Sequence, residues 1–116
     1  MFGAVEEYYD KTGKLYMTNP VSYESKALSG KENVAKEVIK IENTTLFGYL
    51  WNKIYLKDAV VSSGVTFCDM PLNEDFKFNI DFFRYVDSMV ILDDTAYHYA
   101  KRDNQSLTCR FVKKLL

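Results

Sequence analysis

A helix-spaced run of apolar side chains directly behind two carboxylates constrains this fold most. In "NEDFKFNIDFF" and the residues after it, the apolar stripe consists of Phe76, Ile80, Phe82, Phe83 and Val86. Asn73 is predicted to cap this helix, with Glu74 and Asp75 in the first turn, where negative charge suits the helix dipole. The carboxylates then have two interpretations: a solvated helix start, or a general base at the lip of a pocket. Spacing alone favours the helix start.

The first third of the chain predicts a hairpin and a helix. We expect a strand at 2–9, a turn at 10–13 and a short strand at 14–18. Residues 19–28 look irregular. A helix is expected from Ser29 to about Asn43, because Ser29 and Glu32 have the spacing of a capping box.

The remaining segments alternate between helical and extended patterns. Leu46, Leu50 and Ile54 share a helical spacing, and residues 57–64 predict a short helix closed by Gly64 in a left-handed conformation. Residues 88–92 predict a short buried strand. Residues 95–102 predict another extended piece, with Tyr97 and Tyr99 on one side and His98 on the other.

Composition limits the class of protein. With 116 residues, 47% of them hydrophobic and 16% aromatic, the chain fits one folded domain, 1–116. A net charge of −1 offers no basic excess for nucleic acid. A weakly basic C-terminal region is interpreted as solvated, with phosphate or membrane-surface contact left open; it comprises Lys101, Arg102, Arg110, Lys113 and Lys114.

No strong metal, nucleophile or targeting motif is visible. Cys68 and Cys109 lack the spacing of a metal motif, and we expect a reduced, cytoplasmic setting with no signal peptide or bilayer span. His98, the only histidine, is interpreted as packed or exposed rather than as a ligand. Asp93 and Asp94 could hold a divalent cation, but a turn between two strands is favoured. The glycines form no phosphate loop, and no serine has an elbow-like context.

The block "YLWNKIY", residues 49–55, has two interpretations of equal weight. It is either a core helix with a polar bend or a pocket wall in which Asn52 and Lys53 lie among aromatic rings. Nothing else in the block decides between them.

Four blocks in a fixed order resemble the second half of a bacterial family 2 glycosyltransferase. They are "LWNKIY", "SSGVTF", "NEDFKFN" and "AYHYAKRDNQSLT", and they run from about Phe47 to Thr108. The family typically shows W-N-K-x-Y, then a Gly and a Phe before an acidic E-D pair followed by F-N, and a Y-x-Y-R segment ending in S-x-T. The resemblance implies an α+β architecture, a small mixed sheet with flanking helices, like the acceptor-side part of a GT-A fold.

The same resemblance implies an inverting transfer of sugar from a nucleotide-sugar donor to a carbohydrate or lipid-linked acceptor in surface polysaccharide synthesis. Asp75 would be the base that takes the proton of the acceptor hydroxyl, and Glu74 would orient or supplement it. Substrate-binding roles would fall on Trp51, Asn52 and Lys53 near the sugar, and on Lys101 and Arg102 near the donor diphosphate.

Two departures from the family pattern matter. Ala100 stands where the family has an Arg after Y-x-Y, so a phosphate contact would need Lys101 or Arg102 instead. The family's first half, with a D-x-D motif that holds Mg²⁺ or Mn²⁺ on the donor phosphates, has no counterpart here, and Asp93 and Asp94 lie in the wrong place to serve. We therefore expect part of a larger catalytic domain, with no cofactor of its own and no transfer activity alone.

A part of this kind would leave sheet edges and apolar faces uncovered, so self-association as a homo-oligomer is expected. A peripheral position at the inner face of the membrane is the alternative to a purely cytoplasmic one.

A second interpretation of function also stays open: a stand-alone oligomeric interaction module, in which residues 73–75 only begin a helix. The two interpretations differ in whether Asp75 and Trp51 face a common open groove.

Overall fold

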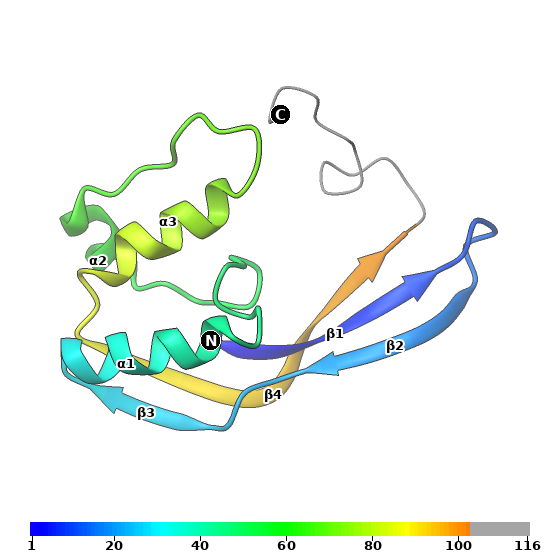
Figure 1. Ribbon diagram of the computed structural model, residues 1–116, viewed down its shortest axis with the longest axis horizontal. Coiled ribbons are helices and arrows are strands. Elements are labelled where there is room, and N and C mark those ends of the chain that lie inside the picture. The colour runs from blue at the N-terminus through cyan, green and yellow to red at the C-terminus, as the bar shows by residue number, and fades with distance from the viewer. Residues whose placement is uncertain (103–116) are drawn as a thin grey trace.

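The structure, a computed structural model, describes residues 1–102. Within that range the elements are β1 (Phe2–Tyr9), β2 (Leu15–Val21), β3 (Lys26–Ser29), α1 (Lys31–Glu42), α2 (Lys57–Ser63), α3 (Glu74–Phe83) and β4 (Ser88–Lys101). The expected α+β class is confirmed: a small, curled, mixed sheet of four strands lies beside three helices (Figure 1). The strand order is β2-β1-β4-β3.

The predicted hairpin is present, and the sheet extends further than expected. β1 and β2 pair antiparallel, and the Asp10 carboxylate in their turn accepts a hydrogen bond from the backbone N–H of Thr12 at 2.8 Å. Residues 19–28 were expected to be irregular, and residues 22–25 are. The flanking residues instead complete β2 and begin β3, so the expectation is wrong for them. Pro20 is tolerated because β2 is an edge strand, where no outer neighbour needs its N–H.

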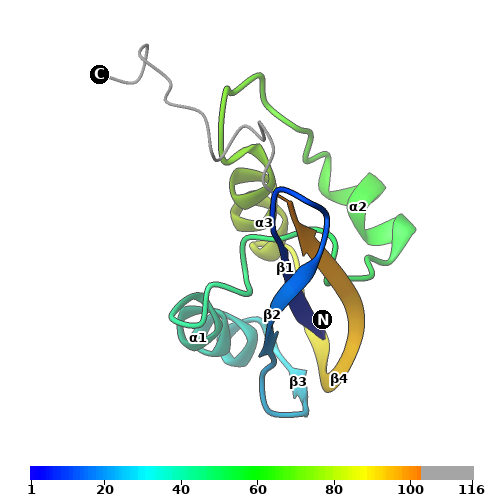
Figure 2. The same ribbon diagram turned by 90° about the vertical axis from the view of Figure 1, so that its right-hand side faces the viewer.

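β4 is one continuous strand, so the expected turn at Asp93 and Asp94 is wrong. Its first part pairs antiparallel with β3, and its second part pairs parallel with β1. Each half of β4 therefore has its own partner strand. The β1–β4 pairing shifts register on both sides of Gly3, and these shifts accommodate the curl of the sheet. Figures 1 and 2 show β4 curling beneath the helices, with the end of the β1–β2 hairpin projecting beyond them.

Two helices lie close to their predicted positions, although one predicted cap is absent. α1 follows Gly30, which has a φ of 93°, and Ser29 makes no side-chain cap, so the predicted capping box is wrong. Instead, Asn33 Nδ2 donates to the Ser29 carbonyl at 2.9 Å. α2 ends at Gly64 in the left-handed conformation with a φ of 70°, as predicted.

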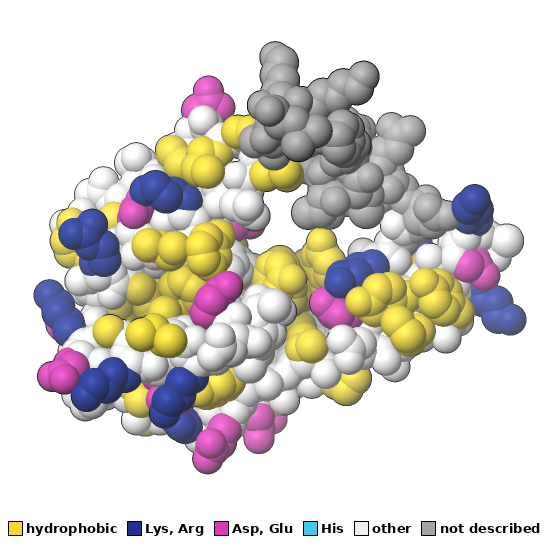
Figure 3. Space-filling view, viewed as in Figure 1, with side chains coloured by type: hydrophobic (Ala, Val, Ile, Leu, Met, Phe, Trp, Pro, Cys, Tyr) yellow, Lys and Arg dark blue, Asp and Glu magenta, His cyan; other side chains and the backbone are white. Residues whose placement is uncertain are grey.

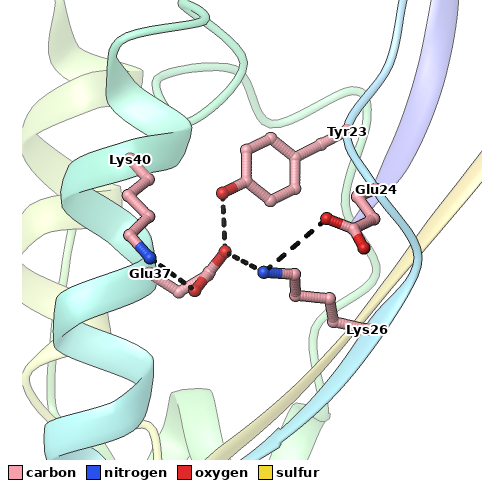
Figure 4. Close-up of polar contacts among 5 residues, drawn as sticks. All are labelled: Tyr23, Glu24, Lys26, Glu37 and Lys40. Atoms are coloured by element: carbon pink, nitrogen blue, oxygen red, sulfur yellow. Dashed lines mark hydrogen bonds and ion pairs between the residues drawn. The ribbon is translucent and has the colours of Figure 1, made fainter.

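A buried carboxylate joins α1 to the sheet (Figure 4). Glu37, only 6% exposed, accepts hydrogen bonds at Oε1 from Tyr23 Oη at 2.6 Å and from Lys26 Nζ at 2.9 Å. Lys40 lies 3.9 Å from its second oxygen. These bonds, that of Tyr23 foremost, lower the pKa of Glu37, so the carboxylate stays ionised inside the fold.

The apolar core lies where α1, the loop after it and β4 meet. Its fully buried members are Ile41, Leu46, Phe47 and Ile91. α3 was predicted to bury Ile80, but that side chain is 43% exposed, while Phe78 and Phe82 are buried. Phe76 and Phe83 do pack against the core, so the predicted stripe is correct only in part.

Candidate functional site

Two buried amide side chains shape the loop between α1 and α2. Asn52, 1% exposed, donates from Nδ2 to the Leu46 carbonyl at 3.1 Å. Asn79 of α3, fully buried, donates to the carbonyls of Phe47 at 3.0 Å and Tyr49 at 3.2 Å. These bonds hold the segment in turns, so the helix suggested by its apolar spacing does not form.

One of these amides, Asn79, connects two of the sequence blocks. The Oδ1 atom of Asn79 accepts a hydrogen bond from Tyr55 Oη at 2.5 Å. Asn79 thereby contacts the W-N-K-x-Y block at the Tyr55 hydroxyl and the segment just before that block at the Phe47 and Tyr49 carbonyls. The order of these blocks along the chain thus has a physical counterpart, since each needs the other to satisfy its buried polar groups.

Trp51 stacks against tyrosines from two parts of the chain. Its ring centroid lies 4.6 Å from that of Tyr49, 4.9 Å from that of Tyr97 and 5.2 Å from that of Tyr99. Tyr97 and Tyr99 share one face of β4, as the alternation predicted. His98 is on the other face, where its ring is bonded to Glu7.

Trp51 and Asp75 line the same open groove, with a volume of about 490 Å³. Its aromatic lining is Tyr49, Trp51, Phe76 and Tyr99, and its carboxylates are Glu42, Glu74 and Asp75. In Figure 3, hydrophobic side chains gather in a hollow between the helical part and the sheet. The groove therefore joins an aromatic surface to an acidic one.

The two carboxylates that begin α3 have the environment of a candidate base. Burial above all, and then the neighbouring Glu74, raise the pKa of Asp75, while Lys53 acts in the opposite direction. Asn73 occupies the N-cap position, but in a left-handed conformation with φ 64° and without a side-chain cap, so its predicted capping bond is wrong. Asparagine tolerates this conformation better than most residues.

Neither Asn52 nor Lys53 lines this groove, and Lys53 instead lines a second groove, of about 690 Å³. The Lys53 ammonium donates to the Leu46 carbonyl at 3.0 Å, to Asn52 Oδ1 at 2.8 Å and to the Tyr49 carbonyl. Burial lowers the pKa of Lys53 to about 7, against the opposing effects of the Glu42 and Asp75 carboxylates. Both side chains shape the groove through the loop that carries Trp51.

The structure separates the two basic residues assigned to the donor diphosphate. Lys101 Nζ donates to Glu6 Oε1 at 2.9 Å and to Tyr8 Oη at 3.2 Å, and it lies 5.9 Å from the Tyr99 ring centroid. Arg102 instead lies over the ring of Tyr9, 4.6 Å from its centroid. The two side chains thus contact neighbouring tyrosines of β1, Tyr8 and Tyr9, which alternate between the faces of that strand. The S-x-T segment, Cys109, and the basic residues Arg110, Lys113 and Lys114 lie outside the described residues.

Metal binding finds no support in residues 1–102. No three His, Cys, Asp or Glu side chains gather there as ligands for a cation. Asp93 and Asp94 are consecutive in an extended strand, so their side chains point to opposite faces.

Two contributors to the site escaped sequence reasoning. Glu42 lines the groove from the end of α1, and Asn79 organises the loop from inside α3. A signal for Asn79 was available: it is a polar residue within an aromatic run. Glu42 offered none, because it ends a helix rich in Lys and Glu.

Comparisons with protein-family models, with curated proteins and with solved structures found no match to this chain. Among the helices of residues 1–102, none combines the length and the apolar character that a membrane crossing requires.

Proposed function

We propose that this chain is the acceptor-side, base-bearing portion of an inverting glycosyltransferase that transfers a sugar from a nucleotide-sugar to an acceptor hydroxyl in surface polysaccharide synthesis. The supporting observation is that Trp51 and Asp75 line one open groove. Their placement on opposite sides of the molecule would have argued for the interaction module instead. The proposed setting is the cytoplasm or the inner face of the membrane.

In this proposal Asp75 acts as the general base. Its carboxylate takes the proton of the acceptor hydroxyl while that oxygen bonds to the anomeric carbon of the donor. The nucleoside diphosphate leaves from the opposite side with the bonding electron pair, so the configuration inverts. Because burial and Glu74 raise the pKa of Asp75, it is a stronger base than an exposed aspartate.

The donor side of the reaction is assigned to no described residue. In a complete enzyme Mg²⁺ or Mn²⁺ would neutralise the donor diphosphate, and no step above depends on it. Donor positioning and charge neutralisation supply much of the rate of such a transfer, so we expect no transfer from this chain alone.

The test begins with the source DNA upstream of the Met1 codon. A reading frame that continues and encodes a D-x-D motif supports the proposal. In that longer protein, Asp75→Asn should lower kcat by about 10²–10⁴-fold, the usual contribution of a general base. Asp81→Asn is the matched control, since Asp81 is on the same helix but is paired with Lys77 and does not line the groove. An upstream stop codon, or a fully active Asp75→Asn enzyme, would contradict the proposal.

A second candidate function, an oligomeric interaction module, is favoured by one observation. Around an apolar groove of about 690 Å³, Ile54, Leu56 and Val90 are 79%, 73% and 57% exposed. Such a surface is typical of a protein–protein contact. Sedimentation velocity should then show a concentration-dependent oligomer that Ile54→Lys disperses, together with no binding of carbohydrate.

A further inference from the structure

We propose that the acceptor bound by the groove is an uncharged sugar ring, and that the carboxylates around it exclude anionic sugars such as uronic acids. This inference rests on the proposed function and narrows it to one class of acceptor.

The charges around the groove have one sign. Among the described residues that line it, Glu42, Glu74 and Asp75 carry carboxylates, and none is Lys, Arg or His. Glu42 also ends α1, where the helix dipole adds negative potential. An anion entering the groove therefore meets repulsion from several sides.

The cation that acts on these carboxylates is held back from the groove. Lys53 interacts electrostatically with Glu42 and Asp75, but its ammonium is bonded to loop oxygens, including the Leu46 carbonyl at 3.0 Å. It has no free donor aimed at a ligand, since an ammonium has three protons and Lys53 has three acceptors. A sugar carboxylate would thus find no described partner there.

An uncharged pyranose fits both surfaces of the groove. Its C–H face suits the apolar rings of Tyr49, Trp51 and Tyr99, since ligand pockets pair such rings with a few placed polar groups. Its hydroxyls can donate to Glu74 and Asp75, because ionised carboxylates are acceptors only. A uronic acid keeps the apolar face but replaces a hydroxymethyl group by an anion, so rejection arises from charge rather than from shape.

The test uses Trp51, the only tryptophan in the chain, as a fluorescence probe of the groove. The 116-residue chain is titrated with matched pairs: methyl glucoside against methyl glucuronide, and methyl galactoside against methyl galacturonide. At low salt we expect at least one neutral member to bind about tenfold or more tightly than its uronide, which is the size of a modest like-charge penalty. High salt should reduce the difference in affinity between the neutral glycoside and its uronide, because it screens the repulsion between charges.

Replacing a carboxylate by its amide tests whether the groove carboxylates cause the rejection of the uronide. Glu42→Gln removes one of the lining carboxylates, so it should reduce the ratio of the affinity for the neutral glycoside to the affinity for its uronide. Glu32→Gln is the matched control, because Glu32 is exposed elsewhere on the same helix and pairs with Lys36. A uronide that binds as well as its neutral partner overturns the inference but leaves the proposed function standing. If no member of either pair binds, the proposed function itself fails and the inference with it.

Discussion

Asp75 and Lys53 carry opposite pKa shifts for one reason, the burial of each near the groove. Burial raises the pKa of Asp75 and lowers that of Lys53 to about 7, because it disfavours the charged form of either group. Each group is thereby brought toward titration at a milder pH than an exposed side chain of its kind. Such perturbed pairs are enriched at functional sites, which agrees with the proposed base.

Asp75→Asn should stabilise the fold at neutral pH. A carboxyl whose folded pKa lies above its unfolded value favours folding fully below the unfolded value, 3.8, and loses that contribution as the pH rises through the folded pKa. Urea titrations at pH 7 should therefore show a higher midpoint for Asp75→Asn, with the difference from wild type shrinking toward pH 3. Asp81→Asn, which breaks the pair with Lys77, should give no gain. A lower midpoint for Asp75→Asn at pH 7 would show that the carboxylate is structurally required.

Lys53 should titrate near neutrality in the folded protein. With ¹³C-labelled lysine, one Cε resonance should shift with a midpoint near pH 7, well below the ordinary lysine value of 10.5. Lys53→Arg should remove that resonance and so assign it. Because the folded pKa lies below the unfolded one, the contribution of Lys53 to stability is present above 10.5 and is lost as the pH falls through about 7. The absence of any lysine resonance with a midpoint near pH 7 would contradict the burial of this ammonium.

At the scale of elements, the loop after α1 and the helix α3 form one unit. Asn79 bonds the carbonyls of Phe47 and Tyr49 and accepts from Tyr55, and the loop in turn carries Trp51 to the tyrosines of β4. The position of Asp75 at the start of α3 is thereby coupled to that of Trp51. The groove depends on this coupling, since its two chemical surfaces come from different elements.

Asn79→Ala should uncouple loop and helix. It leaves the buried Phe47 carbonyl and the Tyr55 hydroxyl without the Asn79 partner, while the Tyr49 carbonyl keeps its bond from Lys53. The loss should cost about 1–3 kcal/mol of unfolding free energy. Trp51 emission should also shift to the red as its surroundings loosen. Asn33→Ala is the control, because Asn33 makes one exposed bond to the Ser29 carbonyl and its loss should cost much less. Equal costs for the two variants would refute the coupling.

At the scale of the whole molecule, the curl of the sheet brings the hairpin, the lead into β3 and β4 together at Gly3. A Cβ atom there would lie 2.9 Å from Ser22 Cβ and 3.1 Å from the carbonyl oxygens of Val21 and Asp93. Two of these neighbours are backbone carbonyl oxygens, so a side chain at residue 3 could be accommodated only if a strand moved. Glycine is therefore required at the point where the curl is tightest.

Gly3→Ala should destabilise the fold by about 1–3 kcal/mol, as overpacking against backbone usually does. Thermal unfolding followed by circular dichroism measures the loss. Gly13→Asn is the control: Gly13 has a left-handed conformation, with φ 82°, and open space around it, and asparagine tolerates such a turn. A Gly3→Ala protein as stable as wild type would mean that the strands separate easily at this point.

Local chemistry determined several features of this protein. The hairpin at residues 2–18, the left-handed end of α2 at Gly64 and the start of α3 at Glu74 were readable because each depends on neighbours within one turn or strand. The division of Tyr97 and His98 between two faces followed from the alternation of a strand. The α+β class was implied by the family resemblance, and these strands and helices agree with it.

Only the tertiary structure decided the loop at 44–56, the continuity of β4 and the groove. The apolar spacing of Leu46, Leu50 and Ile54 suggested a helix. Asn79, which is distant in sequence, instead donates hydrogen bonds to the Phe47 and Tyr49 carbonyls, so these two groups do not need helical hydrogen bonds. β4 stays extended through Asp93 and Asp94 because two separate strands pair with its halves. Trp51 meets Tyr99, and shares a groove with Asp75, for the same physical reason: hydrogen bonds and stacking between distant segments outweigh weak local preferences.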